Sequence, residues 1–140
     1  MQIINRQAKF DYDLQDRLEV GVVLSGAETK SAKGGSVDLN HAFCKFREGE
    51  LWLYNLHIYP YAFANNDSYQ PDRARKLLLS KREAITLQSR MKQGRLLLVP
   101  TAMYTKQGLV KIEVALARGK RKYEKRDAIK KRDLDRELGL

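Results

Sequence analysis

The chain has 140 residues, with 27 Lys or Arg against 17 Asp or Glu, which gives a formal net charge of +10 and an isoelectric point near 9.8. This length allows one modest core, and the charge indicates a polyanionic partner, either nucleic acid or an anionic membrane surface. No stretch approaches the ~20 apolar residues of a membrane-spanning helix, and the start has no apolar core of signal-peptide length, so we expect a cytoplasmic protein.

The first strand and the helix after it are predicted from residues 18–35. Four apolar residues alternate with other residues along a strand that has one apolar face: Leu18, Val20, Val22 and Leu24. Glu19 then lies on the opposite face. Residues 27–33 are long enough for two helical turns, and Gly34-Gly35 can supply the left-handed residue that ends a helix.

A β-hairpin and a long loop follow. Segments 42–47 and 50–56 flank Glu48-Gly49, and glycine accepts the positive φ of a tight turn. The lone Cys44 cannot form an internal disulfide, and we expect it to be a buried, small apolar residue in a reducing compartment. From residue 57 to residue 75 the apolar period disappears, which predicts a long loop of the kind that is often functional.

The second half of the chain predicts a capped helix and a pair of strands. Ser80 and Glu83 have the spacing of a capping box, so we expect a helix from about Lys81 to Lys92 that Gly94 closes. Two strands then lie on either side of a Gln-Gly turn, at residues 96–106 and 109–117.

These elements predict a mainly β fold with one short and one longer helix. The alternation in the strands argues against a parallel sheet, whose strands are apolar on both faces. Closure would remove the exposed edges of so short a sheet. We therefore expect an OB-like closed β-barrel at residues 1–118, followed by a basic C-terminal tail at residues 119–140.

The charged end of the chain has the composition of a tail. From Arg118 onward there are ten Lys or Arg, five Asp or Glu and few apolar side chains. Ile129, Leu134 and Leu138 form too narrow an apolar stripe for a stable isolated helix, so we expect this segment to be disordered when free. It accounts for +5 of the +10, so residues 1–117 are basic as well.

Patterns for catalysis or metal binding are scarce. His41, His57 and the one cysteine cannot complete a four-ligand zinc site without carboxylates, and the sequence has no glycine-rich phosphate loop. We expect no cofactor and no metal. A metal-dependent nuclease stays open as an alternative, because four acids could gather a metal ion: Asp11, Glu19, Glu28 and Asp38.

Basic and aromatic residues gather around the long loop. Arg73, Arg75 and Lys76 end it, and the aromatic residues in or beside it are Tyr59, Tyr61, Phe63 and Tyr69. Proteins hold non-duplex RNA through basic groups on phosphates and aromatic rings stacked on unpaired bases. The pattern indicates RNA binding, and the alternative is solvent-facing charge with tyrosines packed on the rim of the barrel.

Six short motifs occur in order along nearly the whole chain. They are Asn5-Arg6 with Ala8, Asp11 and Tyr12; Glu19 with Gly21; Gly26, Glu28, Lys30 and Ser31; Leu53, Asn55, His57, Ile58, Pro60 and Tyr61; residues 73–79; and residues 115–120 with Tyr123, Lys125 and Arg126. Together they resemble the family of tmRNA-binding small protein B (SmpB), also called SsrA-binding protein. Agreement at so many ordered positions is more specific than any single motif.

The resemblance implies a non-enzymatic protein with an OB-like barrel. Such a protein binds the tRNA-like domain of tmRNA and delivers it to stalled ribosomes for trans-translation. The other implied partners are the decoding centre and mRNA channel of the small ribosomal subunit and, indirectly through charged tmRNA, elongation factor Tu and alanyl-tRNA synthetase; we expect no membrane partner. A generic ribosomal or single-strand RNA-binding OB module is the alternative within RNA-binding proteins.

The resemblance also implies two sets of contact residues. RNA contacts are expected at Asn5, Arg6, Tyr12, Glu19, Lys30, Arg73, Arg75, Lys76, Leu78 and Ser80, of which Glu19, Leu78 and Ser80 fall at the tRNA-like elbow. Ribosome contacts are expected where the tail becomes helical in the empty mRNA channel, at Lys120, Arg121, Tyr123, Glu124, Lys125, Arg126, Lys130, Lys131 and Arg132. Four residues differ from those usual in the family: Thr29, Ser80, Glu124 and Lys131.

Overall fold

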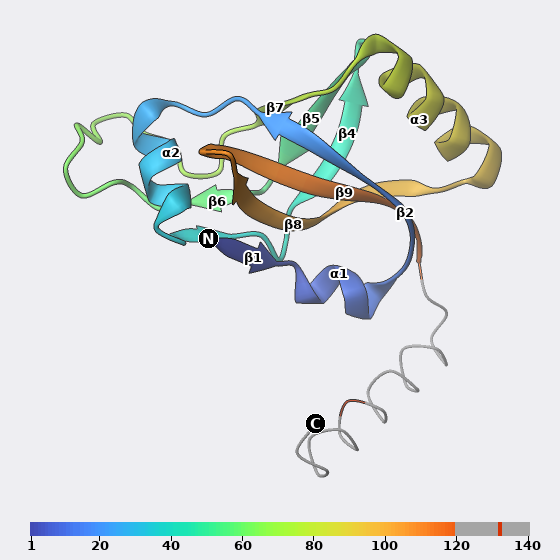
Figure 1. Cartoon of the computed structure of the whole chain (residues 1–140), viewed down its shortest axis with the longest axis horizontal. Coiled ribbons are helices and arrows are strands. Elements are labelled where there is room, and N and C mark those ends of the chain that lie inside the picture. Colours follow the sequence, from blue (N-terminus) through green and yellow to red (C-terminus); the bar gives the residue numbers. More distant parts are fainter. Residues whose placement is uncertain (120–131, 133–140) are drawn as a thin grey trace.

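The computed structural model describes residues 1–119 and Arg132; the remaining residues of the predicted tail, 120–131 and 133–140, lie outside the described residues (Figure 1). In chain order the elements are β1 (Gln2–Ile4), α1 (Arg6–Asp11), β2 (Tyr12–Val22), α2 (Gly26–Lys33), β3 (Val37–Asp38), β4 (Phe43–Arg47), β5 (Glu50–Tyr54), β6 (His57–Ile58), β7 (Arg75–Leu78), α3 (Lys81–Gly94), β8 (Leu97–Lys106) and β9 (Leu109–Gly119).

One antiparallel sheet of seven strands dominates the fold, which confirms the mainly β prediction. Its order is β1-β8-β9-β2-β7-β5-β4, and β3 and β6 pair separately. The edge strands β1 and β4 do not pair with each other within residues 1–119, so closure into a barrel is not confirmed. The sheet nevertheless curls until its two ends approach each other, because β4 at one edge contacts β8, the neighbour of the edge strand β1.

The core lies on the inner face of this curved sheet. The alternation predicted for β9 is confirmed, because its inward side chains Val110, Ile112, Val114 and Leu116 are all buried. Ala117 is buried too, although it belongs to the other face, because Ala8 of α1 packs there with Val99. The short helix α1 therefore covers the outer face at one end of the sheet and leaves the rest of that face uncovered by it (Figure 1).

Both predicted tight turns are confirmed. Glu48 and Gly49, between β4 and β5, have φ of 52° and 80°, and Gln107 and Gly108, between β8 and β9, have φ of 52° and 79°. Glycine adopts such positive φ values without a steric penalty. Cys44 in β4 is buried as predicted, and burial raises the pKa of its thiol well above the ordinary value.

The predicted start of α3 and the predicted end of α2 are confirmed, and the predicted end of α3 is not. At the start of α3 the Glu83 amide donates to the Ser80 hydroxyl (3.1 Å) and the Ser80 amide to the Glu83 carboxylate (2.9 Å), which confirms the capping box. The prediction that Gly94 closes α3 is wrong: Gly94 is helical, and Arg95, with φ of 51°, takes the left-handed position. Gly35 follows α2 with φ of 82°, as the glycine pair predicted.

Several short elements and two strand ends were not predicted by the sequence pattern. β1, α1 and the β3–β6 pair are too short for an apolar period to stand out. β2 begins at Tyr12 rather than at the predicted Leu18. The first part of the strand was missed because a register shift between Leu14 and Arg17 interrupts its alternation against β9. β9 in turn continues to Gly119, two residues beyond its predicted end.

Candidate nucleic-acid interface

The outer face of the sheet presents a row of side chains that lies across four strands. Gly21 of β2 pairs with Leu78 of β7 on one side and with Lys111 of β9 on the other, and Lys111 pairs with Tyr104 of β8. Directly paired residues point to the same face of a sheet. Leu78 is 50% exposed. The row therefore combines an exposed apolar side chain, a cation and a phenol.

Gly21 lets Leu78 lie close against β2. A Cβ atom at residue 21 would be 3.4 Å from the Cβ atom and 3.5 Å from the Cδ1 atom of Leu78. These are ordinary van der Waals distances, so the leucine side chain packs beside residue 21 while half of it stays exposed. An exposed leucine of this kind can pack against a flat partner such as a nucleobase.

Glu19 lies two residues from Gly21 and hence on the same outer face. The Tyr104 hydroxyl donates to Glu19 Oε1 at 2.5 Å, and Lys106 Nζ lies 3.5 Å from the same oxygen. The hydrogen bond from Tyr104, aided by Lys106 and Lys111, lowers the pKa of Glu19. Within residues 1–119, Oε2 has no hydrogen-bond partner. Glu19 is therefore an oriented, ionised acceptor with one oxygen available.

Tyr104, Lys106 and Lys111 were missed by the sequence analysis. Burial, then the hydrogen bond to Glu19, raise the pKa of Tyr104 to about 12, so its hydroxyl stays a donor at neutral pH. The available signal was the alternation in β8 and β9, which places Lys111 on the polar face of the final strand. The missing information was the strand register that brings β8 beside Glu19 through β9.

Two predicted contact residues lie at the β7 end of this row. Lys76 points to the surface, where its Nζ lies 3.1 Å from Glu50 Oε1. Ser80 is exposed at the start of α3, and its oxygen already accepts from the Glu83 amide. The structure therefore places Leu78 and Ser80 two residues apart where β7 leads into α3, and leaves Lys76 in a solvent-exposed ion pair.

The predicted N-terminal contacts are divided between the surface and the interior. Asn5 is buried and caps α1: Oδ1 accepts from the Ala8 amide at 3.0 Å, and Nδ2 donates to the Pro100 carbonyl at 2.8 Å. RNA cannot reach Asn5 in this structure, so its observed role is structural. Arg6 is exposed on α1 and Tyr12 is half-buried at the start of β2.

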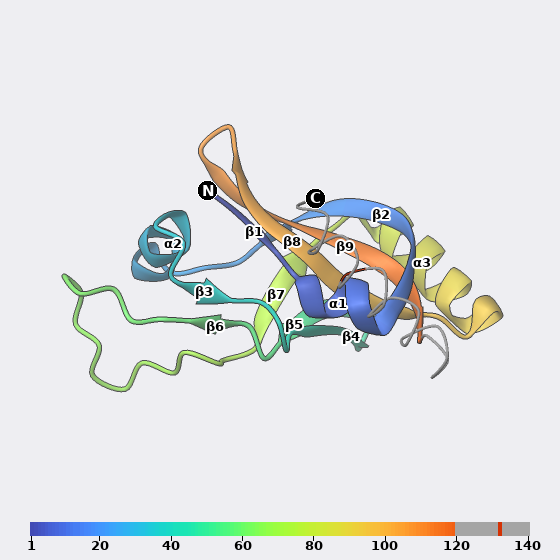
Figure 2. The same ribbon diagram turned by 90° about the horizontal axis from the view of Figure 1, so that it is seen from below.

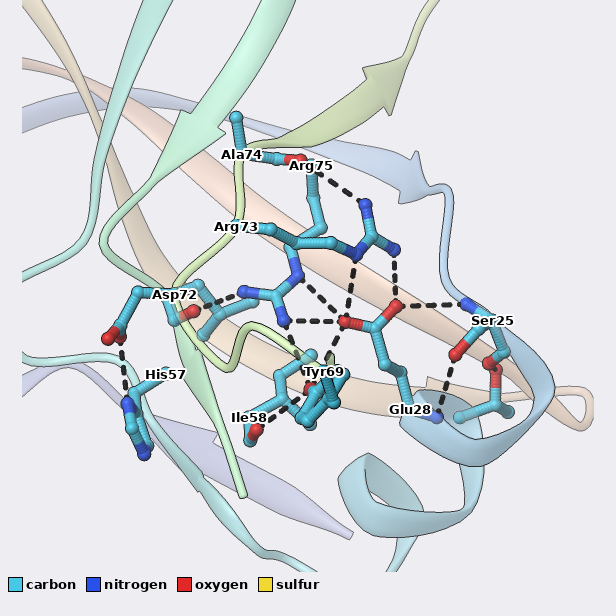
Figure 3. A network of polar contacts seen from close by, with 11 residues as sticks. Ser25, Glu28, His57, Ile58, Tyr69, Asp72, Arg73, Ala74 and Arg75 are labelled. Carbon is cyan, nitrogen blue, oxygen red and sulfur yellow. Dashed lines mark hydrogen bonds and ion pairs between the residues drawn. The ribbon is translucent and has the colours of Figure 1, made fainter. Parts of the chain in front are cut away.

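The basic segment that ends the long loop is bonded to Glu28 rather than free. Arg75 is fully buried; its Nη2 and Nε donate to Glu28 Oε2 at 2.6 and 3.2 Å, and its Nη1 donates to the Leu56 carbonyl (Figure 3). Arg73 binds both carboxylate oxygens of Glu28 and is partly exposed. A direct contact of Arg75 with RNA is thus excluded by burial here, whereas Arg73 can still reach the surface.

The Glu28 cluster, defined as Glu28, Tyr69, Arg73 and Arg75, joins α2 to the long loop. Burial by itself raises the pKa of Glu28, but hydrogen bonds from Arg73, the Ser25 backbone and Arg75 outweigh burial and lower the pKa to about 2. The Tyr69 hydroxyl donates to the Ile58 carbonyl at 2.8 Å and lies 3.3 Å from Glu28. The cluster satisfies its buried charges and fixes the base of the loop.

The remaining predicted residues belong to α2 and the tail. Lys30 is exposed on α2, with Nζ 5.9 Å from the ring centroid of Tyr61 in the long loop. Arg132 is exposed, and its guanidinium lies 5.5 Å from the ring centroid of Phe10. The other predicted ribosome contacts, Lys120, Arg121, Tyr123, Glu124, Lys125, Arg126, Lys130 and Lys131, lie outside the described residues.

Acidic and metal-ligating residues do not gather into a site in the part of the chain that the structure describes. No group of three or more His, Cys, Asp or Glu there is placed to hold a metal ion. Two of the four acids considered for a nuclease have other partners, since Glu28 binds two arginines and Glu19 binds Tyr104. In the same residues no helix is long and apolar enough to cross a membrane.

The chain is a basic, mainly β protein whose curved antiparallel sheet carries exposed apolar, cationic and hydrogen-bonding side chains on its outer face. The comparison with known families is more specific. The family model described as "SmpB protein" matches residues 2–139, and the chain belongs to this family.

Named relatives and a solved structure agree with this assignment. An SsrA-binding protein of Pelobacter propionicus is 46% identical over 134 residues, covering 96% of this chain and 88% of the relative. An SsrA-binding protein of Persephonella marina is 47% identical with the same coverage. A solved chain described as "tmRNA-SmpB: a journey to the center of the bacterial ribosome" matches with a TM-score of 0.71 and 39% identity, over 91% of this chain and 94% of that chain.

Proposed function

We propose that this protein binds the tRNA-like domain of tmRNA and brings it to stalled ribosomes for trans-translation. The observation that supports this most directly is the outer face, where Tyr104 and Lys106 orient Glu19 and where Leu78 is exposed in the same row as Lys111. The names of the relatives, SsrA-binding proteins, and the solved structure described as "tmRNA-SmpB" support tmRNA as the RNA. The ribosome is the second partner for the same reason.

Affinity and selectivity arise from different groups on this face. Lys106 and Lys111, with exposed cations such as Arg6, neutralise phosphates and release counterions. Leu78 packs on an exposed base, and the available oxygen of Glu19 accepts from a base N–H or a 2′-hydroxyl. A carboxylate repels phosphates, so it favours RNA whose bases and sugars, rather than backbone, reach β2. A folded elbow with exposed bases has that shape, whereas a regular duplex does not.

The fold and the division of the chain complete the proposal. We infer an OB-like barrel whose β1 and β4 edges meet through the contact of β4 with β8 rather than through a ladder of hydrogen bonds. Because β9 continues to Gly119, the barrel extends over residues 1–119, one residue beyond the predicted boundary, and the basic tail that enters the mRNA channel begins at residue 120. Elongation factor Tu and alanyl-tRNA synthetase act on the charged RNA, and their link to this chain is indirect. With the ribosome as partner, the protein works in the cytoplasm.

The proposed role requires no catalysis by the protein. Binding and delivery require no covalent bond to be made or broken by this chain. Two of the four acids considered for a metal site already have other partners, since Glu28 bonds two arginines and Glu19 bonds a tyrosine. Incubation of the protein with labelled RNA and Mg²⁺ tests this point. We expect intact RNA; cleavage that a chelator abolishes would support the metal-dependent nuclease instead.

A competition gel shift tests the RNA assignment. We expect labelled tRNA-like domain to be displaced by unlabelled tRNA-like domain at far lower concentration than by unrelated tRNA or unstructured RNA. Glu19→Ala is expected to weaken this binding while the protein remains folded. Equal competition by all three RNAs would instead favour a generic RNA-binding module.

A further inference from the structure

The loop between β6 and β7 carries a pair of neighbouring aromatic rings, of which Phe63 is exposed and Tyr61 is half-buried. Phe63 is 88% exposed, the largest exposed fraction among the exposed large apolar side chains of the described residues. Its ring centroid lies 5.5 Å from that of Tyr61, with the two rings inclined at 67°. Burial in this chain cannot explain an apolar ring at so exposed a position. The pair has the chemistry of a contact surface.

A cation lies beside the pair. Lys30 of α2 places its Nζ 5.9 Å from the ring centroid of Tyr61. Two acids occur in the loop, Asp67 and Asp72, and Asp72 is 2.8 Å from His57 Nδ1. An aromatic face next to a lysine is the combination that holds a base and its phosphate in single-stranded nucleic acid.

Hydrogen bonds hold the loop at its base and near its tip. At the base, Tyr69 and Arg73 bind Glu28, and the Ile58 amide donates to the Pro71 carbonyl at 3.1 Å. Near the tip, the carbonyl of Tyr61 accepts from Asn66 Nδ2 at 2.9 Å and from the Ala64 amide at 3.1 Å. Preorganised rings lose less conformational entropy when they bind a partner.

The loop is separate from the outer face described above. In Figures 1 and 2 it projects beyond α2, at the opposite end of the molecule from α3, whereas Leu78 and Ser80 lie where β7 leads into α3. Its occupant therefore does not have to be the same segment of RNA.

We propose that Tyr61 and Phe63 form a second RNA site, in which the exposed ring of Phe63 stacks on one unpaired base, Tyr61 packs against the edge of that base, and Lys30 contacts a neighbouring phosphate. This inference rests on the proposed function only in taking RNA as the partner. The unpaired base belongs either to the tRNA-like domain or to the RNA of the small ribosomal subunit, and the test separates these sources.

Alanine substitution measures the contribution of the two rings. The double variant Tyr61→Ala/Phe63→Ala is compared with the wild type for binding to tRNA-like domain RNA and, separately, to protein-free 16S rRNA. We expect about tenfold weaker binding to one of them, with an unchanged dependence on salt, because stacking releases no counterions. Lys30→Ala should instead reduce the salt slope by about one phosphate contact.

Phe43→Ala is the matched control. Phe43 is a second exposed aromatic residue, 42% exposed and stacked on Tyr54 with a centroid distance of 5.3 Å, but it lies on β4 rather than on the loop. We expect its removal to leave both affinities unchanged. Unchanged affinities of the double variant for both RNAs would overturn the proposal. The exposed ring would then point to a contact with a protein partner or with a second copy of the chain.

A fluorescent reporter gives an independent measurement. Trp52 is the only tryptophan in the sequence, so Phe63→Trp in a Trp52→Phe background reports on the loop alone. We expect quenched emission and protection from iodide when the bound RNA is the one that the double variant binds weakly. Unchanged emission with both RNAs, at concentrations where a gel shift shows complete binding, would contradict stacking at residue 63.

The same experiments separate this inference from the proposed function. Failure of the wild type to bind tRNA-like RNA would contradict the proposed function. The 16S rRNA measurement would still test whether the loop binds RNA. Tight wild-type binding to both RNAs with no effect of the loop variants would contradict the loop site alone.

Discussion

At the scale of single residues, Tyr104 is expected to orient Glu19 for RNA. Tyr104→Phe removes the hydroxyl that donates to Oε1 at 2.5 Å and keeps the ring. The carboxylate then loses its strongest fixed partner and turns toward Lys106. We expect roughly fivefold weaker binding to the tRNA-like domain, as for the loss of one hydrogen bond, with little change in thermal stability. Equal affinity of variant and wild type by fluorescence anisotropy would contradict a positioning role.

Glu28 is expected to make stability depend on pH in the acid range. Its pKa is lowered from 4.5 to about 2 in the folded protein, so the unfolded chain takes up a proton at higher pH than the folded one. The resulting stabilisation, about 3 kcal/mol, is fully present above pH ~4.5 and is lost as pH falls toward 2. Urea unfolding at pH 7, 4 and 3 measures this loss.

Glu28→Gln is the corresponding substitution. It leaves the fully buried Arg75 without its counter-charge, and breaking a buried pair costs about 3–5 kcal/mol. We expect lower stability at pH 7 and a weaker pH dependence between pH 5 and 2 than in the wild type. A Gln variant as stable as the wild type at pH 7 would show that the cluster has no net stabilising effect.

At the scale of elements, the cap of α3 is expected to be a stabilising feature that RNA does not supply. Ser80→Ala removes the acceptor of the Glu83 amide and should cost about 1 kcal/mol. Ser80→Asn keeps an acceptor at the cap and should restore most of that stability. Denaturant unfolding of both variants without RNA provides the measurement, and a neutral Ser80→Ala change would count against the cap.

Sequence patterns predicted those elements whose local chemistry decides their structure. The hairpin at Glu48-Gly49 and the capping box at Ser80 depend on neighbouring residues and are confirmed. The first half of β2 and the helix α1 were missed because they depend largely on distant contacts, such as Asn5 with Pro100 and the register of Tyr12 with Gly119; the one local signal was Asn5, the N-cap of α1.

The candidate site shows the same limit. Glu19 and Leu78 were predicted from family motifs, and alternation placed Glu19 on the polar face. Tyr104 lies 85 residues from Glu19 in sequence, so their hydrogen bond follows only from the sheet register. Arg75 was predicted as an RNA contact because it lies in a basic segment, and basic segments are usually exposed. In the structure its ion pair with Glu28 keeps it buried.

At the scale of the whole molecule, the proposal assigns RNA binding and ribosome recognition to different parts of the chain. A protein that ends at Gly119 is expected to keep most of its affinity for the tRNA-like domain, since the outer face is intact. It should fail to support tagging of stalled peptides in a reconstituted translation system. Normal tagging by the truncated protein would contradict the separate role of residues 120–140.

The outer face of the sheet is tested most directly by mapping where the tRNA-like domain binds. Amide chemical shifts of the isotope-labelled full-length protein are measured during titration with that RNA. We predict the largest changes at Glu19, Gly21, Leu78 and Lys111, on strands β2, β7 and β9, and small changes at Phe43 and Lys45 on β4. Large changes confined to β4 and β5, with the β2 and β9 amides unaffected by saturating RNA, would contradict RNA binding on the outer face.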